Sequence, residues 1–130
     1  MDAKKLHDEA IREGFSAGQA LTPPAMDVQD TFTGQSWHVP DGPCGFAWVI
    51  VPGNSSFIRQ LKKTNPPIAS TNINDFGPSV EWKKSISQPG YMFWVSEFGQ
   101  SYYKKKEMAK RMAEYLKDNG VKAHWGSRLD

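Results

Sequence analysis

The sequence predicts an α+β fold with a four-stranded antiparallel sheet and two helices on one face. After the first 43 residues, the hydrophobic pattern changes period in the order strand, helix, strand, strand, helix, strand. Residues 44–51 and 91–95 are continuously apolar, as in strands buried on both faces, whereas 79–87 and 121–125 alternate as in edge strands. Central first and third strands between edge strands are typical of the ferredoxin-like sandwich, which is the fold we expect.

The first 43 residues are expected to form a helix and an irregular arm that pack on or near the domain at 44–130. Asp2 can cap the helix, and Gly14 is expected to end it. Residues 15–43 contain four prolines and scattered glycines, which predict no regular element. Because a chain of 130 residues suits one domain, we expect a single structural unit overall.

Two helices are predicted inside the domain from their caps and apolar stripes. Asn54 or Ser55 caps the shorter helix, and an irregular loop at 64–78 follows it. Ser101 caps the longer helix, and Gly120 ends it. Their inner faces are expected to carry Phe57, Ile58 and Leu61 in the first helix, and Met108, Ala109, Met112, Tyr115 and Leu116 in the second.

Charge is distributed unevenly along the chain, although the formal net charge is only +2. Residues 1–50 hold three basic against seven acidic side chains, and residues 51–130 hold thirteen against seven. The basic part could meet an anionic partner or the acidic leader, or the charges could lie on two solvated faces. The single cysteine and the lack of a long apolar segment predict a cytoplasmic protein outside the membrane.

The start of the longer helix is the first candidate site. Lysines in a first turn oppose the helix dipole, and free backbone N–H groups at that end suit an anion. We therefore expect nucleic acid or another polyanion to bind here, although lysines that simply extend into water explain the pattern too. The residues concerned are Gln100, Ser101, Tyr102, Tyr103, Lys104, Lys105 and Lys106, with Arg128 as a further contact.

The second candidate is the sheet face that the two helices leave bare. The segment PGYMFWVS at 89–96 resembles the signature of the RNA-recognition motif at Gly90, Tyr91 and Phe93. The resemblance implies base stacking by Tyr91 and Phe93, with Trp48 on the first strand. These aromatics could equally be core residues. The segment departs from the signature at Pro89, Met92, Trp94 and Ser96.

A catalytic site is the third interpretation. His38, Asp41 and Cys44 lie within seven residues around a turn, so a thiolate paired with histidine is conceivable. Catalytic pairs usually meet through the fold, and Cys44 is more simply a small buried residue at a strand start. His7 and His124 are interpreted as surface residues. We expect no cofactor and no metal.

Two segments, HVPDGPCGFAWV and GVKAHWGSRLD, resemble small uncharacterised proteins encoded by tailed bacteriophages. The resemblance implies a host-directed or genome-handling accessory, or a minor virion component, in the host cytoplasm. We expect a non-enzymatic module that binds nucleic acid or another polyanion. The alternative is a protein-interaction module that meets a host or virion protein through the apolar sheet face or the arm. A Cys44-dependent enzyme ranks third, and the oligomeric state is left open.

Overall fold

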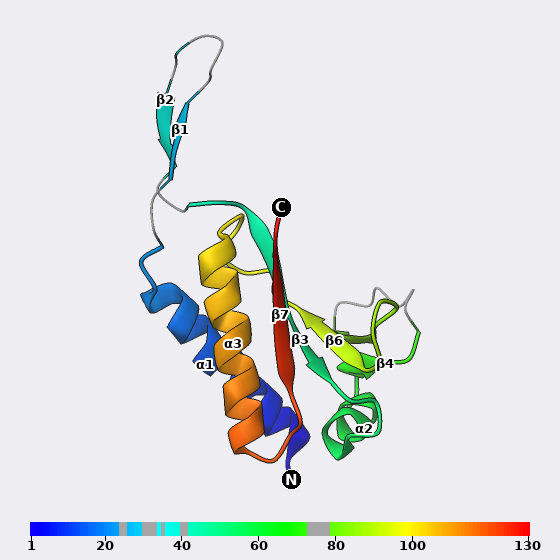
Figure 1. Cartoon of the computed structure of the whole chain (residues 1–130). Coiled ribbons are helices and arrows are strands. Elements are labelled where there is room, and N and C mark those ends of the chain that lie inside the picture. Colours follow the sequence, from blue (N-terminus) through cyan, green and yellow to red (C-terminus); the bar gives the residue numbers. More distant parts are fainter. Residues whose placement is uncertain (24–25, 30–33, 35, 40–41, 73–78) are drawn as a thin grey trace.

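The computed structural model describes residues 1–23, 26–29, 34, 36–39, 42–72 and 79–130 (Figure 1). The helices and strands in this part of the chain are α1 (Ala3–Ala20), β1 (Met26–Gln29), β2 (Ser36–Val39), β3 (Gly45–Val51), α2 (Ser56–Lys62), β4 (Ala69–Ser70), β5 (Trp82–Lys84), β6 (Tyr91–Trp94), α3 (Tyr102–Asp118) and β7 (His124–Leu129). The predicted mixed α+β class is confirmed.

The main sheet has the strand order β4-β5-β6-β3-β7. Its pairs are antiparallel except β4 with β5, which run parallel. The prediction of four antiparallel strands therefore missed one strand. This strand, β4, is a parallel edge strand inside the loop predicted at 64–78. A two-residue strand is too short to leave a periodic signal in the sequence.

The N-terminal segment is more regular than predicted. Helix α1 does not end at Gly14 but continues to Ala20, and strands β1 and β2 form a separate antiparallel hairpin within the residues expected to be irregular. Gly14 is a packing position. A Cβ atom there would lie 2.5 Å from Met112 Cγ and 2.8 Å from the Met108 carbonyl oxygen, so the missing side chain lets α1 approach α3 closely.

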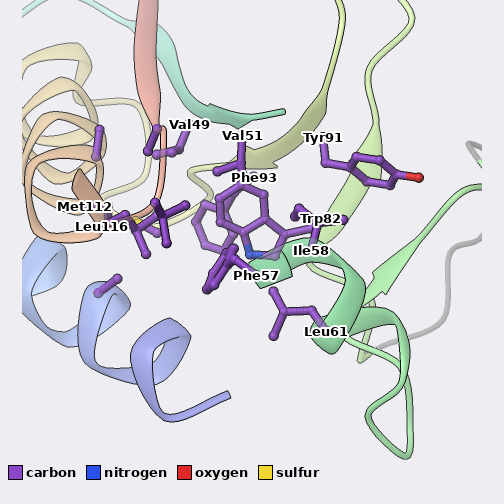
Figure 2. Packing of buried hydrophobic residues seen from close by; sticks show 14 of the residues in the cluster. Val49, Val51, Phe57, Ile58, Leu61, Trp82, Tyr91, Phe93, Met112 and Leu116 are labelled. Carbon is purple, nitrogen blue, oxygen red and sulfur yellow. The ribbon is translucent and has the colours of Figure 1, made fainter. Parts of the chain in front are cut away.

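Helices α1 and α3 pack side by side on one face of the main sheet (Figure 1). The residues of β3 that point to this face, Ala47, Val49 and Val51, are fully buried. Helix α2 adds Phe57, Ile58 and Leu61, which pack around the indole of Trp82 with Phe93 (Figure 2). Both predicted helix stripes are thus confirmed as core, with Tyr115 only partly buried.

The helix caps follow the predicted chemistry. The Ser55 side chain accepts a hydrogen bond from Phe57 N, and the Ser101 side chain accepts one from Lys104 N. Each serine satisfies one of the amide donors that a helix start leaves unpaired.

The edge strands lie elsewhere than predicted. The strand expected at 79–87 is reduced to β5, and Ile86, expected on its apolar side, is 85% exposed. The strand expected at 121–125 begins later, at His124, and continues to Leu129. Alternation alone did not place either boundary, because Val121 and Ala123 are buried before the strand starts. Within the described chain, no helix has the length and apolarity that crossing a membrane requires.

Candidate nucleic-acid interface

The face of the main sheet opposite α1 and α3 carries a row of aromatic side chains. Strand pairing sets Trp48 of β3 directly opposite Trp94 of β6, so both side chains leave the sheet on this face. Their indole rings are nearly parallel, at 6°, with centroids 5.9 Å apart. Phe46 lies two residues before Trp48, and its ring centroid is 5.4 Å from that of Trp94. Trp94 is 44% exposed, so this row is open to a partner.

A glycine in β7 determines how Trp48 lies. Gly126 pairs with Trp48 across the sheet, and a Cβ atom at 126 would come within 2.7 Å of the indole atoms Cε2 and Nε1. The indole therefore occupies the space that a side chain would fill, and covers the backbone of β7. This contact leaves the ring accessible only in part.

Two cationic side chains converge on Phe46 at one end of the aromatic row. The Arg128 guanidinium carbon lies 5.3 Å from the ring centroid, and Lys105 Nζ lies 5.8 Å from it. Arg128 comes from β7, opposite Phe46 in the sheet, and Lys105 comes from the first turns of α3. Within the described part of the chain, neither cation forms a salt bridge. Two uncompensated positive charges beside an aromatic surface favour an anionic partner that stacks.

Beyond Trp94, the same face leads into a cavity of about 770 Å³ along β5 and β6. Its wall includes Met92 and Lys83, which are paired across the two strands, and the exposed Ile86. Glu81 and Glu97 also line it, so the charge here is mixed. The cavity extends the aromatic row with a groove of mixed charge, which Lys83 and Lys84 line together with the two glutamates.

The three consecutive lysines at the start of α3 do not form one patch. Lys104 Nζ lies 5.7 Å from the Phe98 ring, Lys105 lies at Phe46, and Lys106 Nζ lies 6.0 Å from the Trp125 ring. Successive helix residues point about 100° apart, which sends the three charges to different surfaces. Lys105 is 6% exposed, and its ammonium lies beside the Phe46 ring.

The other residues predicted at this helix start have structural contacts. Ser101 is buried as the cap, and Gln100 is exposed in the preceding turn. The hydroxyls of Tyr102 and Ser127 lie 2.9 Å apart and form a hydrogen bond. The rings of Tyr102 and Tyr103 meet edge to face, with centroids 5.3 Å apart. Tyr102 therefore links α3 to β7, and Tyr103 packs against Tyr102.

Two of the three predicted stacking residues lie on the wrong face for the role. Tyr91 and Phe93 are each 5% exposed and belong to the buried core, Tyr91 beside Lys62 of α2 and Phe93 beside His7 of α1, so a base cannot stack on them. Trp48 lies on the open face, and the rings that join it there are Phe46 and Trp94. Alternation along each strand shows which of its residues share a face. The register between β3 and β6 decides which residues of the two strands lie on the same face, and local sequence does not reveal that register.

Of the three candidates in the catalytic interpretation, only Cys44 has a described side chain. Cys44 is exposed rather than buried, and it forms an isolated bridge with Ser101. His38 lies in β2, where only the backbone is described, and Asp41 lies outside the described residues. Among the described residues, no cluster of three or more histidine, cysteine, aspartate or glutamate side chains could hold a metal ion.

His7 is a buried residue that sequence reasoning placed at the surface. It is 2% exposed and meets Trp82 and Phe93 edge to face. Its Nδ1 lies 3.2 Å from Asp8 Oδ1, and its Nε2 lies 2.7 Å from Glu81 Oε2, although the latter contact lacks hydrogen-bond alignment. His7 thereby links α1 to the β5 edge. The usable signal was its spacing from Ala3 and Ala10, four residues before and three after, which puts the three on one side of α1.

Asp8, the acidic neighbour of His7, is held in its ionised form. A hydrogen bond from the Lys4 ammonium lowers the pKa of Asp8, and the contact with His7 acts in the same direction. The pKa of Lys4 is raised by the same partner. Both side chains are largely in water, so this pair orders the first turns of α1 without contributing much stability.

No protein-family model, curated protein or solved structure matches this chain.

Proposed function

We propose that this protein is a non-enzymatic module that binds single-stranded nucleic acid on the open face of its sheet. The observation that carries the proposal is the convergence of Arg128 and Lys105 on Phe46, beside the exposed ring of Trp94. Aromatic rings stack on bases of any sequence, and nearby cations neutralise the backbone phosphates.

The polarity of the face suggests how the ligand lies. A base stacked on Trp94 would place its sugar and phosphate toward the positive end at Phe46, where Lys105 and Arg128 reach from two elements. The neighbouring base would meet the accessible part of Trp48 or enter the cavity at Met92. The start of α3 thus contributes one lysine to the site, rather than the whole basic segment.

The strand order supports the same proposal through the fold. Strands β5, β6, β3 and β7 have the neighbours and antiparallel directions expected of a ferredoxin-like sandwich, with β4 added at one edge. We infer that α1 strengthens the helical layer of such a sandwich. A genome-handling accessory, as implied by the resemblance to bacteriophage proteins, fits this function.

Fluorescence anisotropy with labelled single-stranded oligonucleotides of RNA and DNA tests the proposal. Trp94→Ser should weaken binding about 5- to 150-fold, the range that the loss of one stacked base produces. Arg128→Gln should weaken binding and reduce the slope of log affinity against log salt by about 0.7, the value for one phosphate contact on a single strand.

Matched controls separate the site from general effects. Phe15→Ser removes another exposed aromatic, which stacks on Phe98 away from the Trp48–Trp94 row, and Arg59→Gln removes an exposed cation from α2. Both should leave affinity and salt slope unchanged. The proposal fails if the wild-type protein does not bind either oligonucleotide, or if the control variants weaken binding as much as the site variants. Absence of binding would favour the alternative, a protein partner for the same face.

A further inference from the structure

The free edge of β7 is the longest unpaired strand edge in the described sheet. At the opposite edge, β4 has only two residues, whereas β7 has six, without proline, and pairs with β3 alone. Two of its side chains are exposed apolar groups, Trp125 at 37% and Leu129 at 56%. Long, apolar edges are usually covered or interrupted, since they are templates for pairing with another strand.

The hydrogen-bonding parity of β7 shows which backbone groups are free. Asp130 N donates to Cys44 O, and Val95 N donates to Ala47 O on the other side of β3. Even-numbered residues of β7 therefore bond to β3, and the N–H and C=O groups of Trp125, Ser127 and Leu129 point away from the sheet.

We propose that β7 pairs antiparallel with β7 of a second copy of this chain, with Ser127 on the two-fold axis. Such a dimer joins the two five-stranded sheets into one. This register uses the free backbone groups of all three outward residues and makes the strand self-complementary, as a two-fold interface requires. It is independent of whether the chain binds nucleic acid.

The side chains agree with this register on both faces. On the helical face, Trp125 would lie opposite Leu129 of the second copy, so the two exposed apolar groups cover each other. On the open face, His124 would lie opposite Asp130 of the second copy, where the imidazole N–H can donate a hydrogen bond to the carboxylate. Arg128 of the second copy would lie opposite Gly126, where the Trp48 indole covers the strand. A register shifted by two residues in either direction loses these pairings.

Sedimentation equilibrium without nucleic acid, at protein concentrations from about 5 to about 500 µM, measures the dimer by mass action. Leu129→Lys should weaken dimerisation about 2- to 30-fold, because it disrupts the two symmetry-related pairs with Trp125. Ile86→Lys, the same kind of change at an exposed turn, should have no effect. A chain that is monomeric throughout, or a dimer that Leu129→Lys leaves intact, overturns the proposal.

The register has its own test. His124→Asp should weaken the dimer by placing two carboxylates together, and adding Asp130→Lys should restore it. In a Cys44→Ser background, Ser127→Cys should form a covalent dimer on oxidation, because residues on the axis of such a pair lie about 5.5 Å apart at Cα. Ser87→Cys in the same background should not. A dimer without the Ser127→Cys cross-link, or without the charge rescue, would show that another register or surface is used.

Discussion

Replacing Gly14 by alanine is the sharpest test of how α1 belongs to the fold. Two effects oppose each other in this substitution. Alanine is the better helix former by about 1 kcal/mol, which should stabilise an 18-residue helix. The new methyl group, however, would lie 2.5 Å from Met112 Cγ and 2.8 Å from the carbonyl oxygen of Met108.

The contact with Met108 decides the sign. The Met112 side chain is flexible and can move, but it is fully buried, and the carbonyl belongs to the backbone of α3. Relief therefore requires the two helices to separate by a few tenths of an ångström, and overpacking of this kind costs typically 1–3 kcal/mol. The middle of that range, about 2 kcal/mol, exceeds the propensity gain of about 1 kcal/mol, so we expect a net destabilisation of about 1 kcal/mol.

Urea unfolding followed by circular dichroism measures the difference in the free energy of unfolding. Ser16→Ala is the matched control on the exposed side of the same helix, and it should stabilise by no more than about 0.5 kcal/mol. If Gly14→Ala is more stable than the wild-type protein by about the full propensity difference, α1 does not pack against α3 as described, and the reasoning is refuted.

Two further substitutions test the open face and the helical layer. Gly126→Ala should push the Trp48 indole off β7. Because that ring can rotate, the free energy of unfolding should change by less than about 1 kcal/mol, whereas oligonucleotide affinity should fall about tenfold. Unchanged affinity in the anisotropy assay would contradict the site. The hydroxyl of Tyr115 donates a hydrogen bond to Glu9, 2.6 Å away, and this bond raises the pKa of Tyr115. The stabilisation from the bond should therefore be complete below pH about 10, and it should disappear as the pH rises through the higher pKa of the folded state. Tyr115→Phe should therefore flatten the loss of thermal stability in that alkaline range, and a melting profile identical to that of the wild-type protein would contradict the contact.

Much of the fold was predictable because its signals are local. The caps at Ser55 and Ser101 and the apolar runs of β3 and β6 depend on neighbouring residues, and the structure confirms them. The end of α1 was wrong because the effect of Gly14 depends on α3, some hundred residues later. The two-residue β4 and the true bounds of β7 depend likewise on tertiary pairing rather than on periodicity.

The sequence predicted the two kinds of feature in the candidate site, but not which residues form it. An aromatic sheet face and a basic helix start were both predicted from the sequence, yet Tyr91 and Phe93 were assigned to the wrong face of the sheet. The pairing of Trp48 with Trp94 resolves this, and a shift of one residue in that register would reverse it. Lys105 was grouped with Lys104 and Lys106 by adjacency, whereas helical geometry separates them and joins Lys105 to Arg128.

The position of α1 gives the open face its significance. Helices α2 and α3 lie on one face of the sheet, and α1 could have covered the other face. Instead, α1 packs beside α3. An apolar face then carries Trp94 in water, at a cost that scales with its exposed apolar area. Pairing of β7 between two copies would place two such faces on one continuous sheet, with Arg128 of each copy beside Trp48 of the other. A ligand that spans both faces would bind more tightly to the dimer than to either half, so the two proposals, although tested separately, would reinforce each other in the same molecule.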